Sequence, residues 1–167
     1  LERSLALARR IASRRFAAID LALLGCIAWH GGEAEDARRL LDESWTMCEA
    51  IGTGFAGPIV LGFMAVAADG DAGRRDALAR GEALLDDAAM AHNHLWFRRY
   101  AIDASLAARE WDEALRHAAA IERYTAPEPL PWSDFFVERA RALADAGRGA
   151  GSVPALRSLR DRALAME

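Results

Sequence analysis

Apolar residues recur along this chain at intervals of three and four positions, which is the spacing of one face of an α-helix. The pattern is clearest in segments that end at a glycine or in a polar turn. These segments are Phe16–Gly32, Phe55–Gly70, Leu95–Arg109 and Trp132–Gly147. Each is long enough for about four helical turns, and a second amphipathic segment follows it. The pattern therefore predicts a repeating unit of helix, short turn, helix and longer turn.

Helix-breaking residues fall where this unit needs them. Turns within pairs are predicted at Gly31-Gly32, Gly70 and Arg109-Glu110, and turns between pairs at Gly52-Thr53-Gly54, Asn93 and Pro127-Glu128-Pro129. Pro58 and Pro154 are predicted in the first turns of their helices, where the missing N–H has no helical partner to lose.

The second helices of the pairs also resemble one another. Segments that start at Leu1, Leu41 and Gly81 have a common outline, which gives a period of 40 residues. We therefore predict an all-α fold, a right-handed α-solenoid of antiparallel helix pairs, as one domain over residues 1–167. Its expected parts are 1–14, the second helix of an incomplete pair, and pairs over 15–52, 54–93, 94–126 and 132–166. Because the chain starts at Leu1 inside a pair, we expect it to belong to a longer protein.

Composition narrows the possible chemistry. All 21 basic residues are Arg and none is Lys, which excludes a Walker A phosphate loop and a Schiff-base lysine. The net charge of -4 provides no basic field for nucleic acid. The longest apolar run, Phe55 to Ala68, is too short to span a bilayer. Cys26 and Cys48 do not make a disulfide framework, so we expect a reducing cytoplasm.

Six positions of the first full pair carry a known pattern: Leu21, Leu24, Gly25, Ala28, Ala37 and Leu41. Their spacing resembles the tetratricopeptide signature, in which small residues let two helices approach and leucines fill the interface. The turns Gly32–Ala37 and Glu110–Ala114 resemble the turn of that family into its second helix. The second pair departs, because Gly62 and Ala77 are too far apart. The usual repeat of the family is also only about 34 residues, so other helical-pair solenoids, such as HEAT-like ones, stay open.

A narrower resemblance lies in Ser4–Arg9, Leu40–Ser44 and Glu128–Gly149. These strings look like the C-terminal repeat regions of large bacterial signalling proteins. There, similar repeats follow an ATPase module, often with a class III nucleotide cyclase or a DNA-binding regulator domain. The resemblance implies a binding module of a bacterial cytoplasmic signalling or regulatory protein, and none of the catalytic motifs of those domains is present in this sequence.

Histidines and cysteines do not show the spacing of a metal site. His92 and His94 are two positions apart and do not share a helix face, so we interpret His92-Asn93-His94 as a polar turn that ends a helix, with Asn93 near the cap. Cys26 and His30 share a face, but no CxxC or HExxH motif accompanies them or Cys48. We therefore predict no metal, no cofactor and no catalytic residue.

The first helices of the pairs provide the candidate binding residues, because these helices line the concave binding face of a solenoid. Tryptophan and arginine are enriched in binding hot spots. The candidates are Cys26, Trp29, His30, Trp96, Arg99, Asp103, Val137 and Arg141. We expect a protein or peptide partner. Two alternatives stay open: a sensor with an enclosed pocket under the tryptophans, and an enzyme in which His30, Asp103 and Arg141 converge.

The N-terminal segment predicts a further contact. Leu1, Leu5, Ala8 and Ala12 form an apolar stripe at helical spacing. The helix expected to pair with this stripe is missing from the chain. Exposed ends of solenoids need polar caps, so we expect self-association through this helix.

Overall fold

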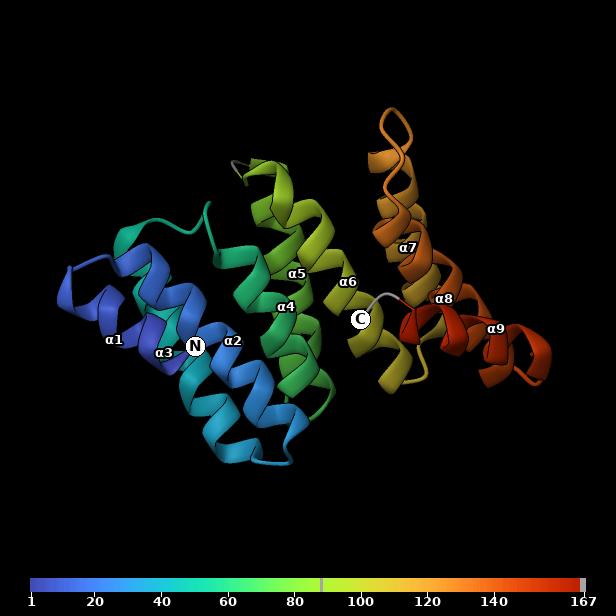
Figure 1. Cartoon of the computed structure of the whole chain (residues 1–167), viewed down its shortest axis with the longest axis horizontal. Coiled ribbons are helices and arrows are strands. Elements are labelled where there is room, and N and C mark those ends of the chain that lie inside the picture. The colour runs from blue at the N-terminus through green and yellow to red at the C-terminus, as the bar shows by residue number, and fades with distance from the viewer. Residues whose placement is uncertain (88, 166–167) are drawn as a thin grey trace. The chain divides into compact units, whose positions relative to one another are not determined.

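The fold is all-α in the computed structural model, which describes residues 1–87 and 89–165. These residues form helices and no strand, which confirms the predicted fold class. The helices are α1 (Glu2–Arg10), α2 (Arg14–His30), α3 (Ala34–Ile51), α4 (Gly57–Ala67), α5 (Asp71–Asp87), α6 (Ala91–Ala107), α7 (Trp111–Thr125), α8 (Pro131–Gly147) and α9 (Val153–Leu164) (Figure 1). No helix among the described residues has the length and apolar character needed to cross a bilayer. Residue 88 and the predicted end of the last pair at 166 lie outside the described residues.

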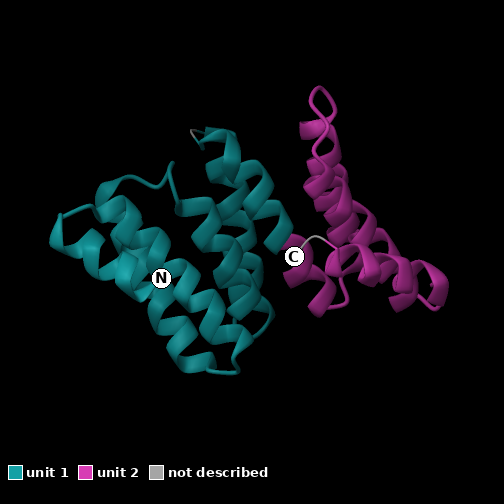
Figure 2. Ribbon diagram, viewed as in Figure 1, with its two compact units in different colours: residues 1–100 teal, residues 101–167 magenta. Residues whose placement is uncertain are grey.

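The chain divides into two compact units, residues 1–100 and 101–167 (Figure 2). The boundary falls inside α6, which begins in unit 1 and ends in unit 2. In unit 1, α2 packs against α1, α3 and α4, and α4 packs against α5. In unit 2, α8 packs against both α7 and α9.

Short turns join successive helices along the chain. The first helices of the pairs begin at Arg14, Gly57, Ala91 and Pro131, so their spacing is not constant. A strict period of 40 residues is therefore not confirmed, and the solenoid arrangement stays a prediction. Pro58 and Pro154 lie in the first turns of α4 and α9, as predicted.

Close approach of α2 and α3 depends on Gly25. A Cβ atom there would lie 2.9 Å from Cγ of Leu41 and 3.1 Å from the carbonyl oxygen of Ala37, both of which are buried. Real Cβ atoms essentially never come that close to another heavy atom, so a larger residue would push the helices apart. The buried Ser44 hydroxyl of α3 donates to the carbonyl oxygen of Ala18 of α2 at 2.7 Å. Gly25 therefore lets α2 and α3 approach closely.

Two of the predicted turns share one backbone geometry. Gly32 has a φ of 85°, and the N–H of Glu33 donates to the carbonyl oxygen of Ala28 at 2.9 Å. Arg109 has a φ of 60°, and the N–H of Glu110 donates to the carbonyl oxygen of Ser105 at 2.9 Å. A left-handed residue followed by a bond to the fifth residue back is the Schellman ending of a helix. The same bond recurs from Ser13 to Ala8 and from Ala150 to Asp145.

The link from α4 to α5 is built differently. Helix α4 ends at Ala67, and Ala68 takes an extended conformation, with φ and ψ of −62° and 139°. Gly70, at a φ of 98°, then leads into α5, whose Arg74 N–H donates to the carbonyl oxygen of Gly70. This link therefore differs from the turns at Gly32 and Arg109.

Helix α1 is shorter than its predicted apolar stripe. Leu5 and Ala8 are buried in a cluster with Ala17 and Leu21 of α2. The helix ends at Arg10, and Ala12 follows in the left-handed region, so Ala12 does not continue the stripe.

We predict that Gly81→Ala destabilises the chain by about 1–3 kcal/mol, because overpacking a buried helix contact has roughly that cost. A Cβ at Gly81 would lie 2.1 Å from Cε2 of the fully buried Phe97. Gly73→Ala on the same helix is the control. Its Cβ would meet only Ala68 at 3.8 Å, so we expect a stabilisation of up to about 1 kcal/mol. Urea denaturation measures both, and equal stability of the two variants would contradict the packing at Gly81.

Candidate functional site

The predicted binding residues of α2 differ in exposure. Cys26 and Trp29 are half-buried and pack against the core cluster that contains Ala18, Leu41 and Phe63. His30 is the last residue of α2 and is exposed. Cys26 and Trp29 therefore contribute to the packing of unit 1 as well as to its surface.

Trp96 and Arg99 lie at an aromatic contact on α6. The Trp96 ring is stacked on Tyr100, with centroids 6.3 Å apart and an interplanar angle of 17°. The Arg99 guanidinium lies 4.4 Å from the centroid of the Tyr100 ring. Tyr100 itself is buried against Phe63. Trp96 is 37% exposed, so part of an indole is presented to solvent on a firmly packed support.

Two of the three candidates in unit 2 are in ion pairs. Asp103 accepts from Arg139 at 2.5 Å. Arg141 donates through both terminal nitrogens to Glu122, at 3.2 and 2.7 Å, and this hydrogen bond lowers the pKa of the Glu122 carboxyl. Asp103 and Arg141 are therefore paired with different residues.

Val137 does not line an open surface, contrary to our expectation. Its side chain is 3% exposed. Ser133, Ala140 and Ala144 are also buried, and these positions share one face of α8 with Val137. The prediction placed Val137 opposite the buried face, whereas it belongs to that face.

His92, Asn93 and His94 begin a helix and do not end one, which corrects the predicted turn. They lie in the first turn of α6. Asn93 is fully buried, and its Nδ2 donates to the carbonyl oxygens of Gly54 and Phe55 at 3.0 and 3.2 Å. Nε2 of His92 lies 3.1 Å from the same Phe55 oxygen. These side chains hold the α3–α4 link against the start of α6.

Metal-ligating side chains do not gather in the part of the chain that the structure describes, where no group of three or more His, Cys, Asp or Glu could hold an ion. Neither Cys26 nor Cys48 is in a disulfide bond in the described part of the chain. Burial raises the pKa of Cys48 to about 11, with a smaller contribution from Glu49, so this thiol stays protonated at neutral pH.

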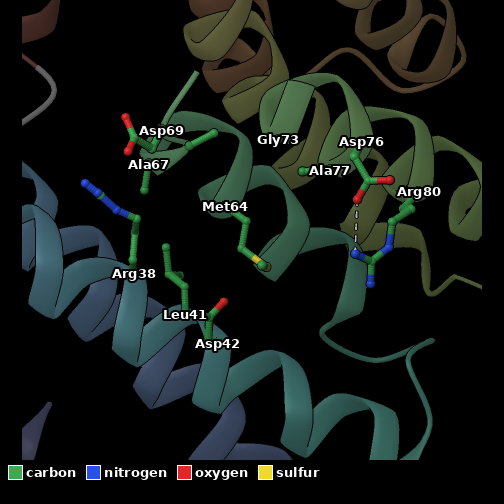
Figure 3. Close-up of a pocket in the computed structure, with 11 residues that line it drawn as sticks. Arg38, Leu41, Asp42, Met64, Ala67, Asp69, Gly73, Asp76, Ala77 and Arg80 are labelled. Atoms are coloured by element: carbon green, nitrogen blue, oxygen red, sulfur yellow. Dashed lines mark hydrogen bonds and ion pairs between the residues drawn. The ribbon is translucent and has the colours of Figure 1, made fainter. Parts of the chain in front are cut away.

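Unit 1 contains a groove of about 210 Å³. Residues of α3, of α4 with the link after it, and of α5 line this groove. Its floor is apolar, and its rim is charged (Figure 3). The lining residues are Arg38, Leu41 and Asp42 of α3; Met64, Ala67, Ala68 and Asp69 of α4 and the link after it; and Gly73, Asp76, Ala77 and Arg80 of α5. None of them was among the predicted binding residues.

The groove exists because α4 ends early. Ala68 and Asp69 follow the extended conformation of the link instead of a further helical turn. Gly73, without a side chain, leaves the space next to Ala68 unfilled, as the 3.8 Å approach of a Cβ placed there shows. The departure of Gly62 and Ala77 from the repeat spacing was the only sequence signal at this place.

The rim charges are only partly paired. Arg80 donates to Asp76 at 3.2 Å, and its guanidinium lies 4.5 Å from the centroid of the Trp45 ring. Arg38, Asp42 and Asp69 have no ion-pair partner among the described residues. Figure 3 shows the Asp76–Arg80 pair at one side of the view and Arg38 and Asp69 at the other.

Comparison with known proteins gives no relative. No protein-family model, no curated protein and no solved structure matches the chain.

We predict that acidification destabilises the chain through His94. Burial, followed by the nearby charge of Arg98, lowers the pKa of His94, and Asp86 opposes this effect in part. The unfolded state then binds more protons below about pH 6.5, so the free energy of unfolding falls as pH drops through that region. His94→Gln should show a smaller loss than the parent between about pH 7.5 and about pH 5.5 in urea titrations. An equal loss in His94→Gln and in the parent would contradict the prediction.

Proposed function

We propose that this chain is a protein- or peptide-binding module that holds a segment of a partner protein in the α3–α5 groove. The observation that supports this proposal is the groove itself, with an apolar floor of Leu41, Met64, Ala67 and Ala77 below an exposed charged rim. Leu41, Ala67 and Ala77 are buried and fixed by the helices. Apolar anchors inside polar rims are typical of protein interfaces.

The size of the groove favours a side chain over a whole small molecule. Sites for drug-sized ligands measure roughly 300–1,000 Å³, whereas this groove measures about 210 Å³. Asp69, Gly73 and Asp76 at its rim are exposed, so a chain can pass over it. The alternative of a sensor for a small ligand therefore has less support than a peptide.

The first-helix surface of unit 1 is proposed as a second contact region. Trp96 is partly exposed and stacked on Tyr100, and Arg99 lies over the same ring. Tryptophan and arginine held in place this way lose little conformational freedom on binding. The enzyme alternative has less support, because Asp103 and Arg141 are paired with Arg139 and Glu122.

Membership of a tetratricopeptide-like family is likewise a proposal. It is supported by the recurring helix pairs, by the close approach at Gly25 and by the Schellman turns at Gly32 and Arg109. The link to bacterial cytoplasmic signalling proteins rests on sequence strings alone. The complete reading frame of the gene would test it by showing which domains accompany this one.

Self-association through α1 is proposed from its exposed apolar side chains. Leu7 of α1 is 46% exposed, and Ile11, which directly follows the helix, is 62% exposed. The two residues are four positions apart, about one helical turn. Burial of apolar area contributes roughly 25 cal/mol per Å² before the cost of association.

The groove proposal predicts that Gly73→Phe weakens binding about tenfold or more, because the new ring fills the groove. Peptides selected from a random display library on the full chain serve as probes, and fluorescence polarisation measures their affinity. Ala79→Phe is the matched control, because it places the same ring at an exposed position of α5 outside the groove lining, and it should bind as the parent does. Trp96→Ala combined with Arg99→Ala tests the first-helix surface with the same peptides. If neither Gly73→Phe nor the double variant weakens binding, the proposed function is wrong in both places.

Self-association predicts a concentration-dependent mass in analytical ultracentrifugation. Leu7→Glu combined with Ile11→Glu should leave a monomer, because two like charges then face the contact. Val153→Glu, at an exposed apolar residue of α9, is the control and should still associate. A parent chain that stays monomeric at high concentration would contradict the proposal.

A further inference from the structure

The groove has more negative than positive charge available to a ligand. Asp76 and Arg80 offset each other, and Arg80 is also held over Trp45. The rim charges without an ion-pair partner among the described residues are the carboxylates of Asp42 and Asp69 and the guanidinium of Arg38. Two carboxylates and one guanidinium give the rim a net charge of about −1, which favours a cationic ligand group.

We infer that the groove takes the side chain of an arginine or lysine from its peptide partner, an inference that rests on the proposed function. Such a side chain has an apolar stem and a cationic head. The stem fits the floor of Met64, Ala67 and Ala77, and the head reaches the rim at Asp42 or Asp69.

Other side chains fit the groove less well. A glutamate or aspartate would enter between carboxylates at positions 42, 69 and 76, with Arg38 as its one available partner. A leucine or phenylalanine would fill the floor but would remove water from Asp42 and Asp69 without replacing their hydrogen bonds, which is costly. A basic side chain satisfies both the floor and the rim.

A substitution of Arg38 can reveal whether the bound side chain is basic or acidic. It is half-buried, lines the groove and has no ion-pair partner among the described residues. Next to a basic side chain, its charge opposes binding, so Arg38→Gln should raise the affinity. For an acidic side chain, Arg38 would be the binding partner, and the same substitution would lower the affinity.

The test uses a fluorescein-labelled alanine–leucine peptide with one central arginine, and matched peptides with citrulline, leucine or glutamate at that position. Citrulline has the shape of arginine without its charge. Fluorescence polarisation on the full chain should show the arginine peptide binding about tenfold more tightly than the citrulline peptide, as a charge-assisted hydrogen bond does. Asp42→Asn and Asp69→Asn should each reduce that preference by about threefold or more. Glu49→Gln removes the same charge from α3 outside the groove lining and should leave the preference unchanged.

The outcomes separate this inference from the proposed function. If the citrulline peptide binds as tightly as the arginine peptide, the inference of a basic side chain is wrong. It is also wrong if the glutamate peptide binds most tightly and Arg38→Gln weakens that binding. In both cases a peptide groove that Gly73→Phe blocks would still stand. Binding that Gly73→Phe does not weaken would place the peptide elsewhere and overturn both. No binding by any of the peptides, with no ligand selected from the library, would also overturn both.

Discussion

The helices of unit 1 meet through positions that have no side chain or only a methyl group. Gly25 lies against Leu41 and Ala37, and Gly81 lies against the ring of Phe97. Because a Cβ at either glycine would overlap its neighbour, the distances between helices are set at these points. The larger buried residues then fill the remaining space. The packing of unit 1 depends on this constraint.

The candidate site arises where the repeated construction changes. Turns at Gly32 and Arg109 end their helices in the same way and lead directly into the next helix. The extended Ala68 interrupts that construction, so the end of α4 leaves an apolar floor partly uncovered. Binding residues are often placed at such irregular connections on a rigid scaffold, because the regular elements hold them in position. The groove combines a fixed floor with exposed charges at its rim.

Sequence periodicity predicted the features that depend on residues close together in the sequence. Helices, their breaks and the small residues at Gly25 and Ala37 follow from spacing and from the backbone preferences of glycine and proline. Val137 was assigned to the wrong face because several faces of α8 carry apolar residues. Asn93 was assigned to a turn because its partners, Gly54 and Phe55, are far away in the sequence. The groove was not predicted either, because residues from three helices that are separate in the sequence line it.

The buried amide of Asn93 has a consequence for the evolution and engineering of this chain. Connections between helices usually accept insertions, because their backbone is solvated. The α3–α4 link is different, since its carbonyl oxygens at Gly54 and Phe55 are bound by Asn93. Lengthening it would separate the buried amide from both acceptors. No side chain of the exposed connection from Pro127 to Leu130 is tied in this way to another described residue. A tag or an inserted domain there would disturb the fold less than one in the α3–α4 link.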